Sequence, residues 1–443
     1  MGTWQLPSEV ASWIDRMARM LDARNAWRLC PLMVGVLFAT GRRTVASWLR
    51  GGGLSNDYKD FYYFISSVGR KVEVIASRLL ETARSRLAPT GRVLLAIDDT
   101  VTKRFGPHIE GAGIHHNPTP GPADHTFAYG HVWVTISWVV RHPWWGTIGL
   151  PLLAKLYVRV KNIPRLSALY GWKFQTKLEQ AAELLEWAVR CLRWLKVSVI
   201  WVVVDGGFVK RPFLRRALAA GVVVVGRLRK DAALWSLPEP YSTKSRGRPR
   251  KYGPNRISLA KRAGARGGWQ TGEFELYGKR VTKKYKTFLA TYAPVGGLIR
   301  VVLVRDEDGW IAWLCTNADA IVHEILEAVA DRAAIEQDFH DIKEVHGSGQ
   351  QQLRNVWANI GAFNLILWLH TLVELWAWNI PHEQLCDRRQ SPWDDPTRRP
   401  SHADRCKALR RASFVLDFST IPIVGPGSRK IHALLKRLAA LVI

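Results

Sequence analysis

The sequence predicts an α/β fold with a mixed central sheet, preceded by a helical domain and interrupted by a basic, β-rich insertion. Between residues 91 and 230, four β-branched apolar runs and one helical stretch predict buried strands and a helix in a sheet core. Residues before 91 have apolar side chains at helical spacing, and residues 227–286 are strongly basic. These observations divide the chain into expected domains at 1–90, 91–230, 231–300, 301–385 and 386–443.

The composition favours a polyanionic partner, and nucleic acid is the first candidate. The chain has 443 residues, of which 64 are Lys or Arg and 37 are Asp or Glu, giving a net charge of +27. Hydrophobic residues make up 47%, which excludes a disordered chain. The five cysteines form no CxxC pair, so we expect a reducing, cytoplasmic location associated with the nucleoid. The polar N-terminus does not predict a signal peptide.

The first 90 residues contain the outline of a helix-turn-helix. An apolar helix is expected around 31–40, followed by a break at Gly41 and a short basic helix over 42–50. Four side chains of this second helix would reach the major groove of DNA: Arg42, Arg43, Ser47 and Arg50. The alternative is an ordinary basic helix facing solvent.

The central elements follow from their apolar patterns. Strands are expected at Val93–Ile97, Val132–Val140, Val199–Val204 and Val222–Val225, with a helix at Thr176–Leu195. A long helix over 320–346 and an apolar helix over 356–380 come later. Asn364, His370 and Glu374 lie within the apolar helix and would be costly in lipid, so we expect a buried core helix and no membrane span. A tail from Asp387 leads to a final helix at Ile431–Ile443.

The basic segment at 227–286 contains 17 Lys and Arg against 4 Asp and Glu. Strand-like stretches at Glu273–Tyr277 and Thr287–Tyr292 suggest an insertion that leaves the sheet and returns near Arg300–Arg305. Within it, one Arg-Gly-Arg-Pro sequence could enter an A·T-rich minor groove or contact phosphates without sequence preference. The residues concerned are Arg246, Arg248, Arg250 and Lys251.

Acidic residues follow two of the predicted strands. Asp98 and Asp99 come after Leu94–Ile97, and Asp205 comes after Val199–Val204. Glu336 lies in the predicted helix that follows the last strand. Carboxylates gathered at one edge of a sheet repel each other, and Mg²⁺ or Mn²⁺ would remove that repulsion and support phosphoryl transfer. The alternative is that these residues cap helices and form turns.

The helix that carries Glu336 adds two cations. Arg332, Glu336 and Lys343 are four and seven residues apart, so all three lie on one helical face. Such a face could bind a metal ion through the carboxylate and DNA phosphates through the cations. As plain structure, the same spacing could be a surface salt bridge.

These motifs resemble bacterial insertion-sequence transposases of the DDE type, which have an RNase H-like core and a Y-R-E-K signature. The resemblance rests on Leu94–Thr100, on the strand that ends at Asp205, and on Arg332-x3-Glu336-x6-Lys343. It covers residues 93–375, and the long basic segment before Glu336 matches members with a β-rich insertion. Val329 stands where the signature has tyrosine. Either Asp98 or Asp99 can be the first aspartate, and the Asp-x-Thr pattern favours Asp98.

The resemblance implies an enzyme that cleaves transposon-end phosphodiesters and joins the 3′-hydroxyl ends to target DNA with two Mg²⁺ or Mn²⁺ ions. It assigns metal binding to Asp98, Asp205 and Glu336, and phosphate contacts to Arg332 and Lys343. The expected partners are terminal inverted repeats, target DNA and a second copy of the chain. No nucleotide cofactor is expected, because the glycine-rich segments do not match a P-loop. No membrane partner is expected either. A nuclease without strand transfer, or a non-catalytic DNA-binding derivative, are the alternatives.

Overall fold

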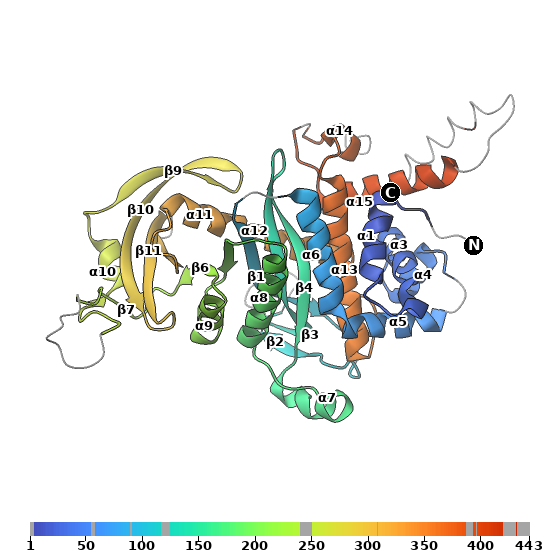
Figure 1. The fold of residues 1–443 in the computed structure, drawn as a ribbon, viewed down its shortest axis with the longest axis horizontal. Coiled ribbons are helices and arrows are strands. Elements are labelled where there is room, and N and C mark those ends of the chain that lie inside the picture. The colour runs from blue at the N-terminus through green and yellow to red at the C-terminus, as the bar shows by residue number, and fades with distance from the viewer. Residues whose placement is uncertain are drawn as a thin grey trace.

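The computed structural model describes residues 4–54, 58–88, 91–116, 125–239, 250–307, 309–386, 393–395, 397–419 and 431. Figure 1 shows that the N-terminal helices and the insertion strands lie at opposite ends of the long axis, with the sheet core between them. The predicted arrangement of a helical domain, an α/β core and a β-rich segment is therefore present.

The N-terminal domain is helical, as expected. Its helices are α1 (Ser8–Ala18), α2 (Ala23–Ala26), α3 (Leu29–Phe38), α4 (Val45–Gly51), α5 (Tyr58–Arg70) and α6 (Val72–Leu87). The short basic helix begins later than predicted, because the Thr44 side chain caps it by accepting from the Ser47 N–H. Arg42 and Arg43 thus lie in the turn before α4. The prediction that Ser47 is exposed was wrong, since its buried hydroxyl donates to the Arg42 carbonyl.

The core sheet has the RNase H-like order of three antiparallel strands followed by two parallel ones. β1 (Val93–Lys103) pairs antiparallel with β3 (Phe127–His142), which pairs antiparallel with β4 (Gly146–Tyr157). On its other side β1 pairs parallel with β5 (Ile200–Val204), which pairs parallel with β6 (Val223–Leu228). All four predicted strands are present. Shorter neighbouring elements are β2 (Gly113–His116), η1 (Val160–Asn162), α7 (Ile163–Tyr170) and α9 (Arg211–Ala219).

The predicted helix at Thr176–Leu195 is α8 (Lys177–Trp194), with Thr176 and Leu195 as its caps. Thr176 and Glu179 form a reciprocal capping box, in which each side chain accepts from the other residue's backbone N–H. This local signal explains why the sequence located the helix start to within one residue.

The basic segment does not leave the sheet, contrary to the sequence-based expectation. β12 (Gly309–Cys315) pairs antiparallel with β6, and β11 and β10 continue the same sheet outward. β6 would otherwise present an unpaired edge, and β12 covers it. The remaining elements here are β7 (Leu234–Trp235), β8 (Arg256–Ile257), α10 (Leu259–Gly264), β9 (Gln270–Leu276), β10 (Lys279–Tyr292) and β11 (Gly297–Asp306).

The predicted helix over 320–346 is divided at Arg332 into α11 (Val322–Asp331) and α12 (Ala333–Glu344). After α13 (Val356–Ala377) come α14 (His382–Leu385) and α15 (His402–Ser419), and the latter was not predicted. The tail has no clear apolar period, so its helical state depends on burying Cys406 and Leu409. The predicted helix 431–443 lies outside the described residues, apart from Ile431.

α13 is a core helix, as expected. Within the described residues it alone is long and apolar enough to cross a membrane, but 94% of its most apolar window is buried inside the protein. Polar side chains of α13 form hydrogen bonds with backbone groups of β4 on the side that faces away from β3. Asn364 accepts from the Ala154 N–H and donates to the Ala154 carbonyl. Trp368 and Thr371 donate to the carbonyls of Leu152 and Pro151. Side chains of α13 therefore occupy an edge that would otherwise be open.

The N-terminal domain is fixed to the core where α5 crosses α13. A Cβ added to Gly361 would lie 2.0 Å from the Ile65 carbonyl oxygen, and one added to Gly69 would lie 1.9 Å from the Trp357 carbonyl oxygen. Both neighbours are backbone atoms and cannot rotate away. Glycine at these two positions lets the helix backbones approach each other directly.

We therefore expect Gly361→Ala to lower the free energy of unfolding by about 1–3 kcal/mol, because the helices must separate to admit the methyl group. Urea denaturation followed by circular dichroism would measure the change. Gly264→Ala in α10 is the matched control, because a Cβ there meets no atom within 4 Å. Equal stability of the two variants would contradict this account of the α5–α13 crossing.

Candidate active site

The register between β1 and β5 brings two aspartates together. The last paired residues are Ile97 and Val204, so Asp98 and Asp205 follow side by side. The strand predicted to end at Ile97 continues to Lys103 through its pairing with β3. Because β5 stops at Val204, the β5 side of β1 is unpaired from Asp98 onward. The site opens at this step between a long strand and a short one.

α12 brings the glutamate to the same place through Arg332. The Arg332 guanidinium donates from Nη1 to Asp98 Oδ2 at 2.7 Å and from Nη2 to Glu336 Oε1 at 2.5 Å. The side chains of Asp98 and Arg332 are each 19% exposed, whereas that of Glu336 is 57% exposed. The predicted one-face relation of Arg332 and Glu336 is present, and it joins them to an aspartate from the sheet.

Burial governs the protonation of Asp98. It raises the pKa of Asp98 to about 6, while the positive charge of Arg332 and a hydrogen bond from the Asp99 N–H act in the opposite direction. The negative charge of Asp205 raises the pKa of Asp98 further. The same Asp205 charge helps to raise the pKa of Arg332, so the exposed Asp205 carboxylate belongs to this electrostatic group. The Arg332 guanidinium thus bridges two carboxylates and lies within the electrostatic influence of a third.

Asp98 and Asp99 are separated by the alternation of the strand. Asp98 pairs in register with Thr135, and both share a face with Ser137, which donates to Asp338 of α12 at 2.9 Å. Asp99 instead accepts from Lys177 of α8 at 2.7 Å. The structure therefore places Asp98 with Arg332 and Glu336, and it places Asp99 with α8, apart from the other two predicted carboxylates.

Two aspartates hold the end of α11 and the middle of α12 against the sheet. The buried Asp338 accepts from Ser137, and burial raises the pKa of Asp338 to about 7. Gly149 of β4 allows this approach, since a Cβ there would lie 2.1 Å from Asp338 Oδ2. Directly before Arg332, at the end of α11, Asp331 accepts from Thr147 at 2.6 Å and from Arg141 at 3.1 Å. Sequence reasoning missed both aspartates, although their spacing of seven residues on the helix was a usable signal.

The other predicted contact residues are more scattered. Arg42 and Arg50 are exposed beside α4, whereas the Arg43 N–H donates to Gln350 and its guanidinium to the Ala39 carbonyl. Lys343 is half-buried near the end of α12. Of the minor-groove residues, Arg250 and Lys251 are exposed, while Arg246 and Arg248 lie outside the described residues.

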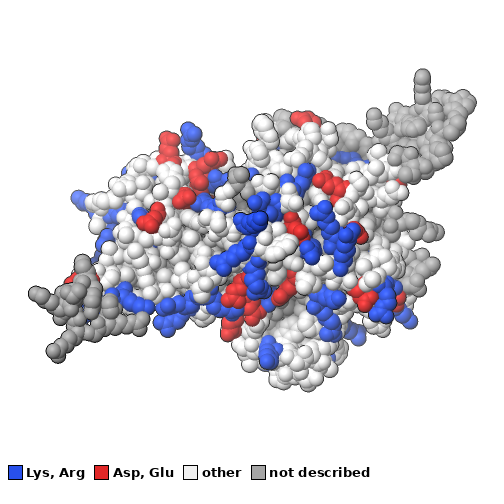
Figure 2. Space-filling model, in the orientation of Figure 1, with Lys and Arg blue, Asp and Glu red and all other residues white. Residues whose placement is uncertain are grey.

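One basic residue that was not predicted lies on the strand next to Asp205. Arg227 of β6 is exposed. A Cβ added to Gly206, the residue after Asp205, would lie 3.2 Å from the Arg227 carbonyl oxygen and 3.7 Å from the Arg227 Cβ. Arg227 was not among the predicted site residues, although it lies two residues after a predicted strand of the same sheet. Figure 2 shows Lys and Arg side chains gathered over the middle of the visible face, with an acidic group below them over α8. Part of the molecule's excess charge therefore lies over the core.

Comparison with known families finds two matching family models. The family model described as DDE superfamily endonuclease matches residues 16–271, which is more than half of the chain. A second model, described as transposase DDE domain, matches residues 179–372. The first match spans Asp98 and Asp205, and the second spans Asp205 and Glu336. No curated protein matches the chain.

The Arg332 bridge makes a prediction about stability. An ordinary aspartate has a pKa of 3.8 and Asp98 has a pKa of about 6, so this group reduces folded-state stability as the pH rises between these values. Arg332→Gln removes the partner of the ionised form and raises the pKa of Asp98 further. We expect the variant to lose about 1–2 kcal/mol more at pH 8 than at pH 5.

Urea denaturation at the two pH values would measure this difference. Arg332→Lys keeps the positive charge and should show a smaller dependence on pH. The same loss of stability in Arg332→Gln at both pH values would mean that the guanidinium does not support an ionised Asp98.

Proposed function

The chain belongs to the DDE superfamily endonucleases, and from this premise we propose that it is a DNA transposase that cuts transposon ends and joins them to target DNA. The family implies DNA substrates and the use of divalent metal ions. The proposal is finer, because it includes joining of the 3′-hydroxyl ends and a site of three named carboxylates. One observation carries it: Arg332 bridges Asp98 and Glu336 at the place where Asp205 follows its strand.

The residues fit a divalent ion. Asp98, Asp205 and Glu336 offer only carboxylate oxygens, which are the ligands that Mg²⁺ and Mn²⁺ prefer. Glu336 and Asp205 are exposed, so a site between them is open to a polymer as large as DNA. Two bound ions would activate a water or a 3′-hydroxyl and stabilise the leaving oxygen in an in-line displacement.

Arg332 has two roles in this proposal. In the structure its guanidinium partly neutralises Asp98 and Glu336, which lets three carboxylates gather in a partly buried place. Guanidinium groups also bind phosphate in a two-pronged fashion. We propose that Arg332 turns to a phosphate of the transposon end when DNA and metal ions are bound. Lys343, further along α12, would contact the same strand.

DNA would extend from the core toward both ends of the molecule. The exposed Arg42 and Arg50 belong to the N-terminal domain, and Arg250 and Lys251 belong to the basic segment at the opposite end of the long axis (Figure 1). Both ends of a transposon must be held together before they are joined. We therefore propose that two copies of the chain act on one pair of ends.

A cleavage and strand-transfer assay tests the catalytic proposal. Glu336→Gln is expected to lower both activities at least a hundredfold while DNA binding remains, because an amide oxygen carries no charge for a metal ion. Glu344→Gln, an exposed position on the same helix, is the matched control and should retain activity. Equal activity in Glu336→Gln and the native chain would overturn the assignment of Glu336.

The same assay distinguishes the alternatives. Asp98→Asn should share the loss of Glu336→Gln, whereas Asp99→Asn should stay within about tenfold of the native activity, since Asp99 pairs with Lys177. Cleavage without insertion of 3′-hydroxyl ends into a second duplex would indicate a nuclease. Binding of DNA without cleavage in either Mg²⁺ or Mn²⁺ would indicate a non-catalytic derivative.

Recognition by the N-terminal domain makes a separate prediction. Changing Arg42 and Arg50 together to alanine should weaken binding to the terminal repeat at least tenfold and reduce the preference over unrelated DNA. Fluorescence anisotropy with labelled duplexes would measure both. Changing Arg19 and Arg24 to alanine removes the same charge from exposed arginines that are paired with acids, and it should have less than a threefold effect. An equal effect of the two double variants would argue for nonspecific attraction alone.

A further inference from the structure

A group of ionisable side chains is buried where the segment after α12 meets α13 and α15. It consists of His346, His370, Glu374, His402 and Cys406, and we call it the buried histidine cluster. Each of these side chains is almost completely inaccessible to solvent. Polar groups in such a place are costly unless they are paired or bind an ion. The carboxylates of the candidate active site are not part of this group.

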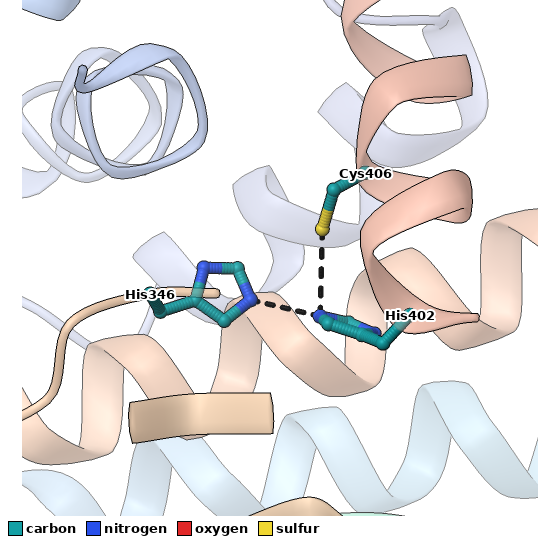
Figure 3. Close-up of side chains that lie close together, drawn as sticks. All are labelled: His346, His402 and Cys406. Carbon is teal, nitrogen blue, oxygen red and sulfur yellow. Dashed lines mark hydrogen bonds between the residues drawn. The ribbon is translucent and has the colours of Figure 1, made fainter. Parts of the chain in front are cut away.

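Three members of the cluster converge on one point, as Figure 3 shows. His346 Nε2 lies 2.8 Å from His402 Nε2, and Cys406 Sγ lies 3.4 Å from the same nitrogen. His402 and Cys406 are four residues apart and share a face of α15, while His346 comes from the chain just after α12. Two imidazole nitrogens and one sulfur are thereby directed at a common position.

The tautomer of His402 is set by Glu374. The Nδ1–H of His402 donates to Glu374 Oε1 at 2.6 Å, which leaves Nε2 with a lone pair that faces His346 and Cys406. Arg405 donates to the same carboxylate oxygen at 3.0 Å and holds it in place. A histidine that donates one ring nitrogen to a carboxylate and presents the other to a metal ion is the usual arrangement at zinc sites.

The protonation of the three groups is compatible with ligation. Burial lowers the pKa of His402 to about 4 and lowers the pKa of His346 well below its usual value, so both imidazoles are neutral. Burial also raises the pKa of the Cys406 thiol to about 12. The thiol therefore keeps its proton in the absence of a cation, and a bound metal ion would take the place of that proton.

We propose that the buried histidine cluster is a zinc-binding site, with His346, His402 and Cys406 as the protein ligands and Glu374 as the carboxylate that orients His402. Two nitrogens and a thiolate are typical ligands of Zn²⁺ and poor ligands of Mg²⁺. Bonds of about 2.0 Å to nitrogen and about 2.3 Å to sulfur place tetrahedral donors roughly 3.3–3.5 Å apart. The observed separations need only a small shift of the side chains to reach this range.

The other side of the cluster fits a metal ion less well. There the Glu374 carboxylate already binds the cationic Arg405, whose charge would repel a divalent ion. The His370 ring stacks on His402 at 3.9 Å, and its Nε2 lies 3.8 Å from Asp341 and 4.0 Å from Asp338. Both His370 nitrogens and Glu374 Oε2 lack a hydrogen-bond partner within the described structure, which favours this side, but the charge of Arg405 outweighs it. We therefore place the ion on the Cys406 side.

A cavity borders one side of the cluster. It has a volume of about 230 Å³ and is lined by residues of α12, α13 and the start of α15, including His370, Glu374 and His402. An ion bound by His346, His402 and Cys406 would tie the end of the Glu336 helix to α15. Zinc would then be a structural element of the protein, separate from the ions of the proposed catalytic site.

The metal content of the full-length protein tests the proposal. We expect about one zinc ion per chain after dialysis in excess Mg²⁺, measured by mass spectrometry of the elements. Cobalt substitution should give the absorption of a sulfur-to-cobalt charge transfer. Cys406→Ser should reduce zinc to less than a tenth of the native content and abolish that absorption, and Glu374→Gln should weaken zinc binding about 10–100-fold.

Cys315→Ser is the matched control, because Cys315 is a buried cysteine outside the cluster. Glu336→Gln should also retain zinc, since it changes only the proposed catalytic site. The proposal is overturned if folded native protein binds no zinc or cobalt. It is equally overturned if the cobalt complex lacks the sulfur signature, or if His370→Asn loses the metal while Cys406→Ser keeps it.

Discussion

The register between β1 and its parallel neighbour β5 is the constraint on which the candidate active site depends. With Ile97 opposite Val204, Asp98 and Asp205 follow next to each other at the end of the shorter strand. A shift of β1 by one residue would turn Asp98 toward α8 and present Asp99 in its place. The antiparallel pairing of β1 with β3 fixes the same register independently, because Asp98 lies opposite Thr135 over a long, buried ladder. Two neighbouring strands thus determine which aspartate faces α12.

The helix break at Arg332 completes the geometry that the strands begin. Since Arg332 stands between α11 and α12, its guanidinium reaches Asp98 on the sheet and Glu336 one turn along α12 at the same time. Asp331 and Asp338, on either side of this point, are tied to Thr147 and Ser137. The position of Glu336 therefore rests on contacts between α12 and the antiparallel strands, while the position of Asp98 rests on the parallel pair.

Much of this arrangement could be read from the sequence because its signals are local. β-branched runs located the core strands, a helical pattern over Thr176–Leu195 located α8, and spacing alone paired Arg332 with Glu336. The predictions failed where contacts between residues far apart in the sequence determine the secondary structure. α15 is helical because Cys406 and Leu409 bury against the core, and β12 joins the sheet because β6 offers an edge. The two ligands of the proposed zinc site on α15 and the third after α12 have no spacing that a motif could describe.

α13 links these separate parts mechanically. It crosses α5 of the N-terminal domain at backbone contact, covers the edge of β4 with Asn364, Trp368 and Thr371, and supplies Glu374 to the buried histidine cluster. A helix that packs on all sides must be apolar all round, which is why its sequence imitates a membrane span. Because α5 and β4 both contact α13, the N-terminal helices and the core sheet pack against one shared helix. In the proposed function, packing on α13 would thus orient DNA bound by the N-terminal helices relative to the carboxylates at the sheet edge.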